Sequence, residues 1–154
     1  MNADPRVQEI KHAVGEAIAE WGAVEAMLGE LMAIAINGDH ATTLAAFHAV
    51  ESSDAKLRMV DAALRQAIEQ DDPLATWGEL NGKARGLLAK RDQFVHWTVV
   101  WDSGRPLLRG QPGAFKAGFG TEFGGYSADD IQAARTDMIQ LMKAISALGQ
   151  RIEF

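Results

Sequence analysis

Residues 5–36 read PRVQEIKHAVGEAIAEWGAVEAMLGELMAIAI, and the pattern of this stretch indicates the fold class. Its large apolar side chains recur at steps of three and four residues, at Val7, Ile10, Val14, Ile18, Trp21, Leu28 and Met32. Such spacing lines up one face of an α-helix. Asn37-Gly38-Asp39 then gives a strong stop signal. The pattern predicts a helix from about Pro5 to Ile36 with one stripe to bury.

The same periodicity predicts three more helices, each preceded by a residue that can cap a helix N-terminus. They run from Thr42 or Thr43 to about Gln70, from the N-cap Asp72 and Pro73 to about Val95, and from Ser127 toward the C-terminus. Ser52-Ser53-Asp54 falls between two periodic stretches, so a kink or a fresh N-cap is expected there. We therefore expect an all-α fold, a four-helix up-and-down bundle.

Between the third and fourth helices the pattern changes. Residues 97–101 favour extended structure and residues 102–104 favour a turn, which predicts a short β-hairpin with Leu107 and Leu108. Residues 110–125 then hold six of the fifteen glycines. Their spacing fits no phosphate-binding motif, so we expect a flexible flap. Residues 1–154 are thus expected to form one helical domain, with residues 97–126 as a hairpin and Gly-rich loop insertion.

The composition excludes several functional classes. The chain has 154 residues, a net charge of −6 and no cysteine, which excludes disulfides, thiolate metal sites and a cysteine nucleophile. The N-terminal residues lack the basic and apolar stretches of a signal peptide, and no segment approaches the length that spans a bilayer. We expect a cytoplasmic protein without a membrane partner.

The charge is unevenly distributed along the chain. Residues 83–116 hold seven Lys and Arg against two Asp, a balance of +5, which leaves −11 for the remainder. A basic island on an acidic body favours a local phosphate site over a broad nucleic-acid surface. An ordinary fluctuation of charge along the chain explains this uneven distribution equally well.

Arg91 is the candidate functional residue that the pattern singles out. Apolar side chains share one arc of the third helix, namely Trp77, Leu80, Ala84, Leu87, Leu88, Phe94 and Val95, and Arg91 lies in the middle of that arc. A guanidinium cannot lose its proton, so its burial requires a carboxylate or an anion. Glu25 is the one carboxylate inside the stripe of the first helix, and we expect it to pair with Arg91.

His96 is the titratable group nearest to Arg91 in the sequence. It either caps the end of the helix or works with Arg91 as an acid or base. Trp97 and Trp101 could stack on bases or belong to the core. No HxxxH, HExxH or histidine–carboxylate spacing is present, so we expect neither a metal site nor a cofactor.

Two sets of repeated glycines bear on assembly. Gly15, Gly22 and Gly29 repeat every seven residues on the first helix, and Gly78, Gly82 and Gly86 repeat every four on the third. Because each glycine weakens a helix interior by about 1 kcal/mol, repetition on one face suggests close approach of another helix. That helix lies either in a second subunit, with the contact near Gln93 and His96, or in the same chain, if the first and third helices pack together.

The segment Arg91-Asp92-Gln93-Phe94-Val95-His96, which ends a helix of a helical bundle, resembles the Arg-x4-His signature of the HEPN superfamily. The stretch Trp21-Gly22-Ala23-Val24-Glu25 is also similar to the first helix of bacterial HEPN-like families. The resemblance covers residues 5–97 and 127–150. Asp92 replaces the commoner Asn, and Trp97 replaces a small residue that usually follows the histidine.

The resemblance implies an all-α homodimer in which two Arg-His motifs meet in one cleft. Many such proteins are metal-independent endoribonucleases, often toxins with an antitoxin partner or defence effectors; others are inactive binding modules. Arg91 would hold the scissile phosphate, His96 would be general acid or base, and Asp92 would orient them, giving a 2′,3′-cyclic phosphate. Contacts to RNA would come from Lys90, Trp97, Trp101 and Arg105. The second hypothesis is a catalytically inactive helical dimer that binds a protein or small ligand.

Overall fold

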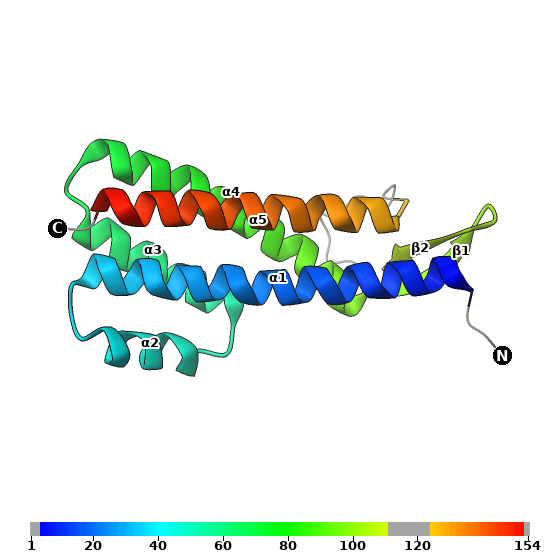
Figure 1. Cartoon of the computed structure of the whole chain (residues 1–154), viewed down its shortest axis with the longest axis horizontal. Helices are drawn as coiled ribbons and strands as arrows, with labels where there is room; N and C mark the ends of the chain where they lie inside the picture. Colours follow the sequence, from blue (N-terminus) through cyan, green and yellow to red (C-terminus); the bar gives the residue numbers. More distant parts are fainter. Residues whose placement is uncertain (1–3, 111–123, 153–154) are drawn as a thin grey trace.

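The computed structural model describes residues 4–110 and 124–152, and these residues are mostly helical (Figure 1). The helices are α1 (Pro5–Ile36), α2 (His40–Ala49), α3 (Ser53–Ala67), α4 (Asp71–His96) and α5 (Ala128–Ile152), and the strands are β1 (Thr98–Asp102) and β2 (Arg105–Arg109). The all-α class is confirmed. The described residues carry five helices where four were predicted, because the predicted second helix divides into α2 and α3.

The long first helix is the central element. It packs against each of the other four helices and against β2. In Figure 1, α5 runs alongside α1 for most of its length and α2 lies against α1 on the side away from α5. The hairpin lies at the same end of the molecule as the start of α1.

Side-chain caps explain where several helices begin. The Asp39 carboxylate accepts the backbone N–H of Thr42 at 2.9 Å and starts α2, and the Ser52 hydroxyl accepts the N–H of Ala55 at 3.3 Å and starts α3. Of the two alternatives predicted at residues 52–54, the fresh N-cap is therefore the one observed, since Val50 is already extended.

The ends of the last two helices are close to those predicted. Gln70, not Asp72, precedes α4, and it makes no side-chain cap hydrogen bond. The hydroxyl of Ser127 accepts the backbone N–H of Asp130 at 3.2 Å, which starts α5 where expected.

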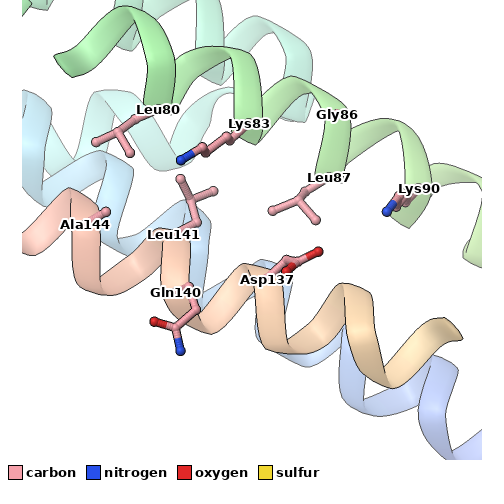
Figure 2. A pocket seen from close by; sticks show the side chains of 9 residues that line it. All are labelled: Leu80, Lys83, Gly86, Leu87, Lys90, Asp137, Gln140, Leu141 and Ala144. Atoms are coloured by element: carbon pink, nitrogen blue, oxygen red, sulfur yellow. The ribbon is translucent and has the colours of Figure 1, made fainter. Parts of the chain in front are cut away.

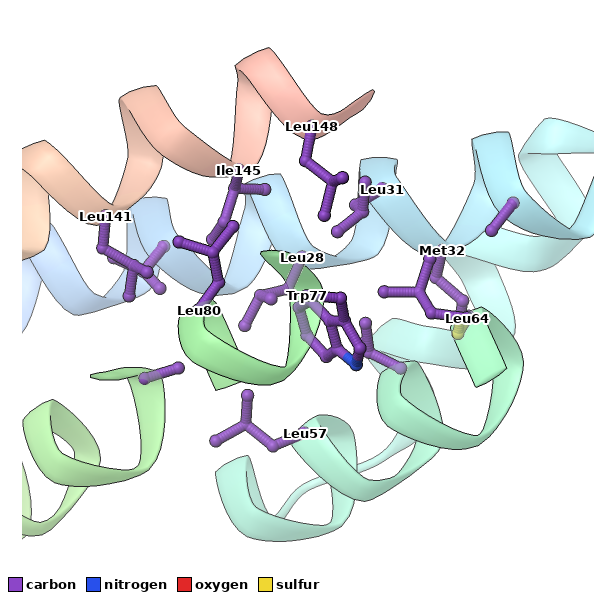
Figure 3. Close-up of a cluster of buried hydrophobic side chains, with 14 of the residues drawn as sticks. Leu28, Leu31, Met32, Leu57, Leu64, Trp77, Leu80, Leu141, Ile145 and Leu148 are labelled. Atoms are coloured by element: carbon purple, nitrogen blue, oxygen red, sulfur yellow. The ribbon is translucent and has the colours of Figure 1, made fainter. Parts of the chain in front are cut away.

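The buried apolar residues form two clusters. The larger draws on all five helices and surrounds the fully buried Trp77, with Leu28 and Leu31 of α1, Leu64 of α3 and Ile145 of α5 close by (Figure 3). The smaller lies toward the hairpin and consists of Ile10, Ala13, Ala17, Phe94, Leu108, Ile131 and Ala134. These clusters include most of the predicted stripe residues. Val7, Val14 and Ile18 of α1 are only half-buried, and Val95 of α4 is 42% exposed.

The predicted hairpin is confirmed. Thr98 pairs with Arg109 and Asp102 with Arg105, and the two turn residues Ser103 and Gly104 have φ of 50° and 81°. Two successive residues of positive φ make the turn that suits the right-handed twist of paired strands. Trp97 is the C-cap of α4 and is not part of the strand. Of the predicted flap at residues 110–125, residues 111–123 lie outside the described residues.

The repeated glycines do not bring α1 and α4 together. Gly29 is buried against α2, where an added Cβ would lie 2.9 Å from Cδ1 of Phe47. At Gly15 and Gly22 of α1, and at all three repeated glycines of α4, an added Cβ would meet nothing within 4 Å. Of the two alternatives, packing inside one chain is therefore not made through these glycines, although α1 and α4 do contact each other elsewhere.

Candidate functional site

Arg91 lies on the inner side of α4, at the level where the core is divided. Along α4 the larger cluster ends at Leu88 and the smaller begins with Phe94, and Arg91 falls between them. Its side chain is 28% exposed, and its Nη1 donates a hydrogen bond of 2.9 Å to Asp92. The Nε atom is buried and has no acceptor among the described residues. The guanidinium therefore keeps unused hydrogen-bonding capacity beside its one carboxylate.

His96 is the exposed last residue of α4. Five residues at about 100° each turn it roughly 140° away from Arg91, so the two side chains leave the helix on different faces. Within the described residues His96 makes no hydrogen bond or ion pair. One chain thus does not bring Arg91 and His96 into a common cleft.

The predicted ion pair between Glu25 and Arg91 is wrong. Glu25 instead accepts hydrogen bonds from Lys56 at 2.7 Å, from the indole of Trp21 at 3.0 Å and from the hydroxyl of Ser53. Burial pushes the pKa of Glu25 upward, but the hydrogen bonds outweigh it, so this pKa lies below its ordinary value. Lys56 projects from α3, which packs beside this part of α1, and so it reaches the carboxylate.

The two candidate tryptophans have different surroundings. Trp97 is half-buried, and its ring centroid lies 5.5 Å from that of Tyr126. Trp101 is 54% exposed, and the guanidinium of Arg6 lies 5.0 Å above its ring. Both line a groove of about 500 Å³ between α1 and the hairpin, whose floor includes Phe94. Because Arg6 covers Trp101, stacking on a base would require displacing that contact.

The structure neutralises much of the basic island. Arg85 pairs with Asp54 at 3.1 Å and Arg109 with Asp102 at 3.2 Å, as Arg91 does with its neighbour. The candidate contact residue Arg105 is exposed on β2. A broad phosphate-binding surface is not assembled from these arginines in the described chain.

Two further cations of the island, Lys83 and Lys90, border a groove between α4 and α5. This groove of about 430 Å³ has an apolar floor made by Leu80, Leu87, Leu141 and Ala144. The lysines Lys83 and Lys90 of α4 and the polar Asp137 and Gln140 of α5 rim it (Figure 2). Among the described residues no carboxylate lies within 4 Å of either lysine ammonium. Neither groove is lined by Arg91 or His96.

A second polar network surrounds Asp61, and the sequence pattern does not indicate it. Asp61 of α3 accepts the indole N–H of Trp77 at 2.8 Å and the amide of Asn81 at 3.2 Å, and Arg65 also donates to it. Burial raises the pKa of Asp61, but these donors lower it below its ordinary value. Since α4 supplies the indole and the amide, the network joins α3 to α4.

No three acidic or histidine side chains within residues 4–110 and 124–152 gather as metal ligands. Across the same ranges no helix is both long enough and apolar enough to cross a membrane.

Comparisons with protein-family models, with curated proteins and with solved structures found no match for this chain.

Proposed function

We propose that this chain is a helical interaction module in which α1, α3, α4 and α5 act as a bundle scaffold. Its binding surface is the groove between α4 and α5, and its partner is an apolar helical segment that carries acidic side chains. The observation that carries the proposal is that Lys83 and Lys90, which form no ion pair with any described residue, lie above an apolar floor rich in leucine. A leucine-rich segment would be buried on the floor, and acidic flanking residues would meet the ammonium groups.

Binding of model peptides tests this proposal. Two labelled amphipathic peptides share a leucine face, and one carries glutamates where the other carries lysines. Fluorescence anisotropy should show that only the acidic peptide binds, and that added salt weakens binding. The double variant Lys83→Glu/Lys90→Glu should reverse the preference. Equal binding of both peptides, or binding of neither at about 100 µM, would reject the groove as this site.

A blocking variant locates the contact. Gly86 lines the groove and is exposed, and an added Cβ there meets no atom within 4 Å, so Gly86→Phe should fill the groove without disturbing the fold. Gly22→Phe, at an equally open position on α1, is the matched control. Peptide binding should be lost in the first variant and kept in the second.

The HEPN-like endoribonuclease is the second candidate, and the state of Arg91 favours it. Asp92 accepts a hydrogen bond of 2.9 Å from the guanidinium, and Nε has no acceptor among the residues that the structure describes. A phosphate could use that donor, with His96 as the general acid or base from the exposed end of the helix. Because Arg91 and His96 diverge in one chain, catalysis would need a second chain to complete the site.

Cleavage of mixed RNA in the presence of a chelator tests the nuclease. Activity should survive chelation, yield a 2′,3′-cyclic phosphate end and fall at least about 100-fold in His96→Ala. The control His12→Ala removes a histidine that is 76% exposed on α1 and should retain full activity. If no RNA is cut, or if His96→Ala cuts as well as the parent, the nuclease assignment is withdrawn.

A further inference from the structure

Both walls of the groove between α4 and α5 are helix faces. The residues that line it from α4 recur at steps of three and four, and they include Leu80, Lys83, Leu87 and Lys90. The lining residues of α5 repeat in the same way, at Asp137, Leu141 and Ala144. Such spacing keeps side chains on one face of a helix. The lined stretch of α4 is about 15 Å long, which matches about three turns of a third helix.

The apolar floor favours an occupant that satisfies its own backbone hydrogen bonds. An extended segment would lay N–H and C=O groups on Leu80, Leu87 and Leu141 without partners for them. A helix keeps these groups bonded inside itself and can bury a leucine face on the floor. Gly86, which is exposed and has no side chain, leaves room for that helix between the two lysines.

The two walls carry opposite charges. Lys83 and Lys90 lie on the α4 wall, and Asp137 lies on the α5 wall. Figure 2 shows Asp137 across the groove from Leu87, at a level between the two lysines. Asp137 is exposed and forms no ion pair with any described residue. A segment with acidic residues on both flanks would therefore place like charge against Asp137.

The spacing of the lysines specifies the acidic flank of the occupant. Lys83 and Lys90 are seven residues apart, which is about 10.5 Å along the axis. Two residues seven apart on the occupant lie on the same side of it with the same separation. Glutamates at these positions can meet both lysines, and a basic residue on the other flank can meet Asp137.

Opposite charges on the two walls also fix the direction of binding. When a helix is turned end for end with its leucine face kept on the floor, its two flanks exchange walls. A segment with one acidic and one basic flank therefore meets opposite charges in one direction and like charges in the other.

We infer that the groove accepts a helical segment with two acidic residues seven apart on one flank and a basic residue on the other, and that it accepts this segment in one direction only. The acidic flank lies along α4 and the basic flank along α5. This inference rests on the proposed interaction function, and it adds the charge pattern and the direction of the partner.

Two labelled peptides with the same leucine face test the charge pattern. The first carries two glutamates seven residues apart on one flank and a lysine on the other, and the second has glutamate in place of that lysine. Fluorescence anisotropy should show that the parent protein binds the first at least about threefold more tightly, because an exposed ion pair changes affinity by up to about fivefold. Asp137→Lys should reverse the preference. The control Asp129→Lys, at an exposed position of α5 outside the groove, should retain it.

A third peptide tests the spacing. Its glutamates are five residues apart, so they diverge by about 140° and only one of them can face a lysine. It should bind at least about twofold more weakly than the first peptide.

Nuclear magnetic resonance with nitroxide-labelled peptides tests the direction. A nitroxide on one end of the first peptide should broaden amide signals around Leu80 or around Lys90, and a nitroxide on its other end should broaden the opposite set. The second peptide is the control, because both of its flanks are acidic and its two directions are equivalent. Either label on it should broaden both sets.

The outcomes separate this inference from the function on which it rests. Equal binding of all three peptides, an equal effect of Asp129→Lys and Asp137→Lys, or broadening of both sets by one label on the first peptide would overturn the inference. The interaction function would then stand, since the peptides still bind. If none of the peptides binds at about 100 µM, the inference and the interaction function fall together.

Discussion

Replacing Gly29 with alanine should destabilise the protein, although the same replacement at Gly22 on the same helix should stabilise it. At Gly29 the new Cβ would lie 2.9 and 3.1 Å from two ring atoms of Phe47 and 3.3 Å from Cδ2 of Leu44. The Phe47 ring is fully buried and cannot retreat without moving α2. At Gly22 the new methyl group would meet no atom within 4 Å.

The magnitudes follow from two opposing effects. Alanine improves either helix position by about 1 kcal/mol relative to glycine. Overpacking a filled core costs about 1–3 kcal/mol, and this cost applies at Gly29 alone. The two variants should therefore differ by about 1–3 kcal/mol in free energy of unfolding, which corresponds to about 2–12 °C in Tm for a chain of this size.

Urea denaturation followed by circular dichroism measures both variants against the parent. Gly22→Ala should unfold at higher urea than the parent, and Gly29→Ala at lower urea, with equal slopes in the transition. If Gly29→Ala is as stable as Gly22→Ala, then α2 does not pack closely on α1, and the reasoning about Gly29 is refuted.

Two half-buried carboxylates give further predictions. Glu25→Gln removes the charge that holds Lys56 and should cost about 1.5–3 kcal/mol at pH 7. Because the pKa of Glu25 is lowered in the folded state, this difference should be complete above about pH 4.3 and vanish as the pH falls through the lowered value, which a pH series of urea midpoints measures. Asp61→Ala leaves the indole N–H of Trp77 without its acceptor and should cost about 1–3 kcal/mol in thermal unfolding. The control Asp54→Ala, at a half-exposed surface ion pair, should cost less than about 1 kcal/mol, and equal losses for the two aspartates would contradict the assignment of Asp61.

Local features predicted the elements well. The first helix has the predicted bounds of Pro5–Ile36. They were predictable because the apolar spacing and the stop signal after Ile36 depend only on residues close together in the sequence. The hairpin was predictable because Asp102-Ser103-Gly104 is a turn signal, and Gly104 adopts without strain the positive φ that the turn requires. The sequence does not distinguish a kink from the division between α2 and α3, since a kink and a fresh cap at Ser52 leave the same apolar periodicity on either side.

The candidate site was less predictable, because it depends on which helices are neighbours. Periodicity places Glu25 on the inner face of its helix but does not tell whether α3 or α4 lies opposite. The nearest cation is Lys56 of α3, and Arg91 is left with Asp92. Likewise, the register of Asp61 with Trp77 depends on the packing of α3 against α4, which neither segment encodes alone.

The division of the core at Arg91 has a consequence for local stability. The cluster near the hairpin holds seven buried residues and the other holds twenty-one, so less free energy opposes its opening. Amide protons of the first turns of α1, the hairpin and the last turn of α4 should therefore exchange with solvent deuterium sooner than those around Trp77. The end of the protein that bears His96 is then the part that can open and reclose while the remainder stays folded.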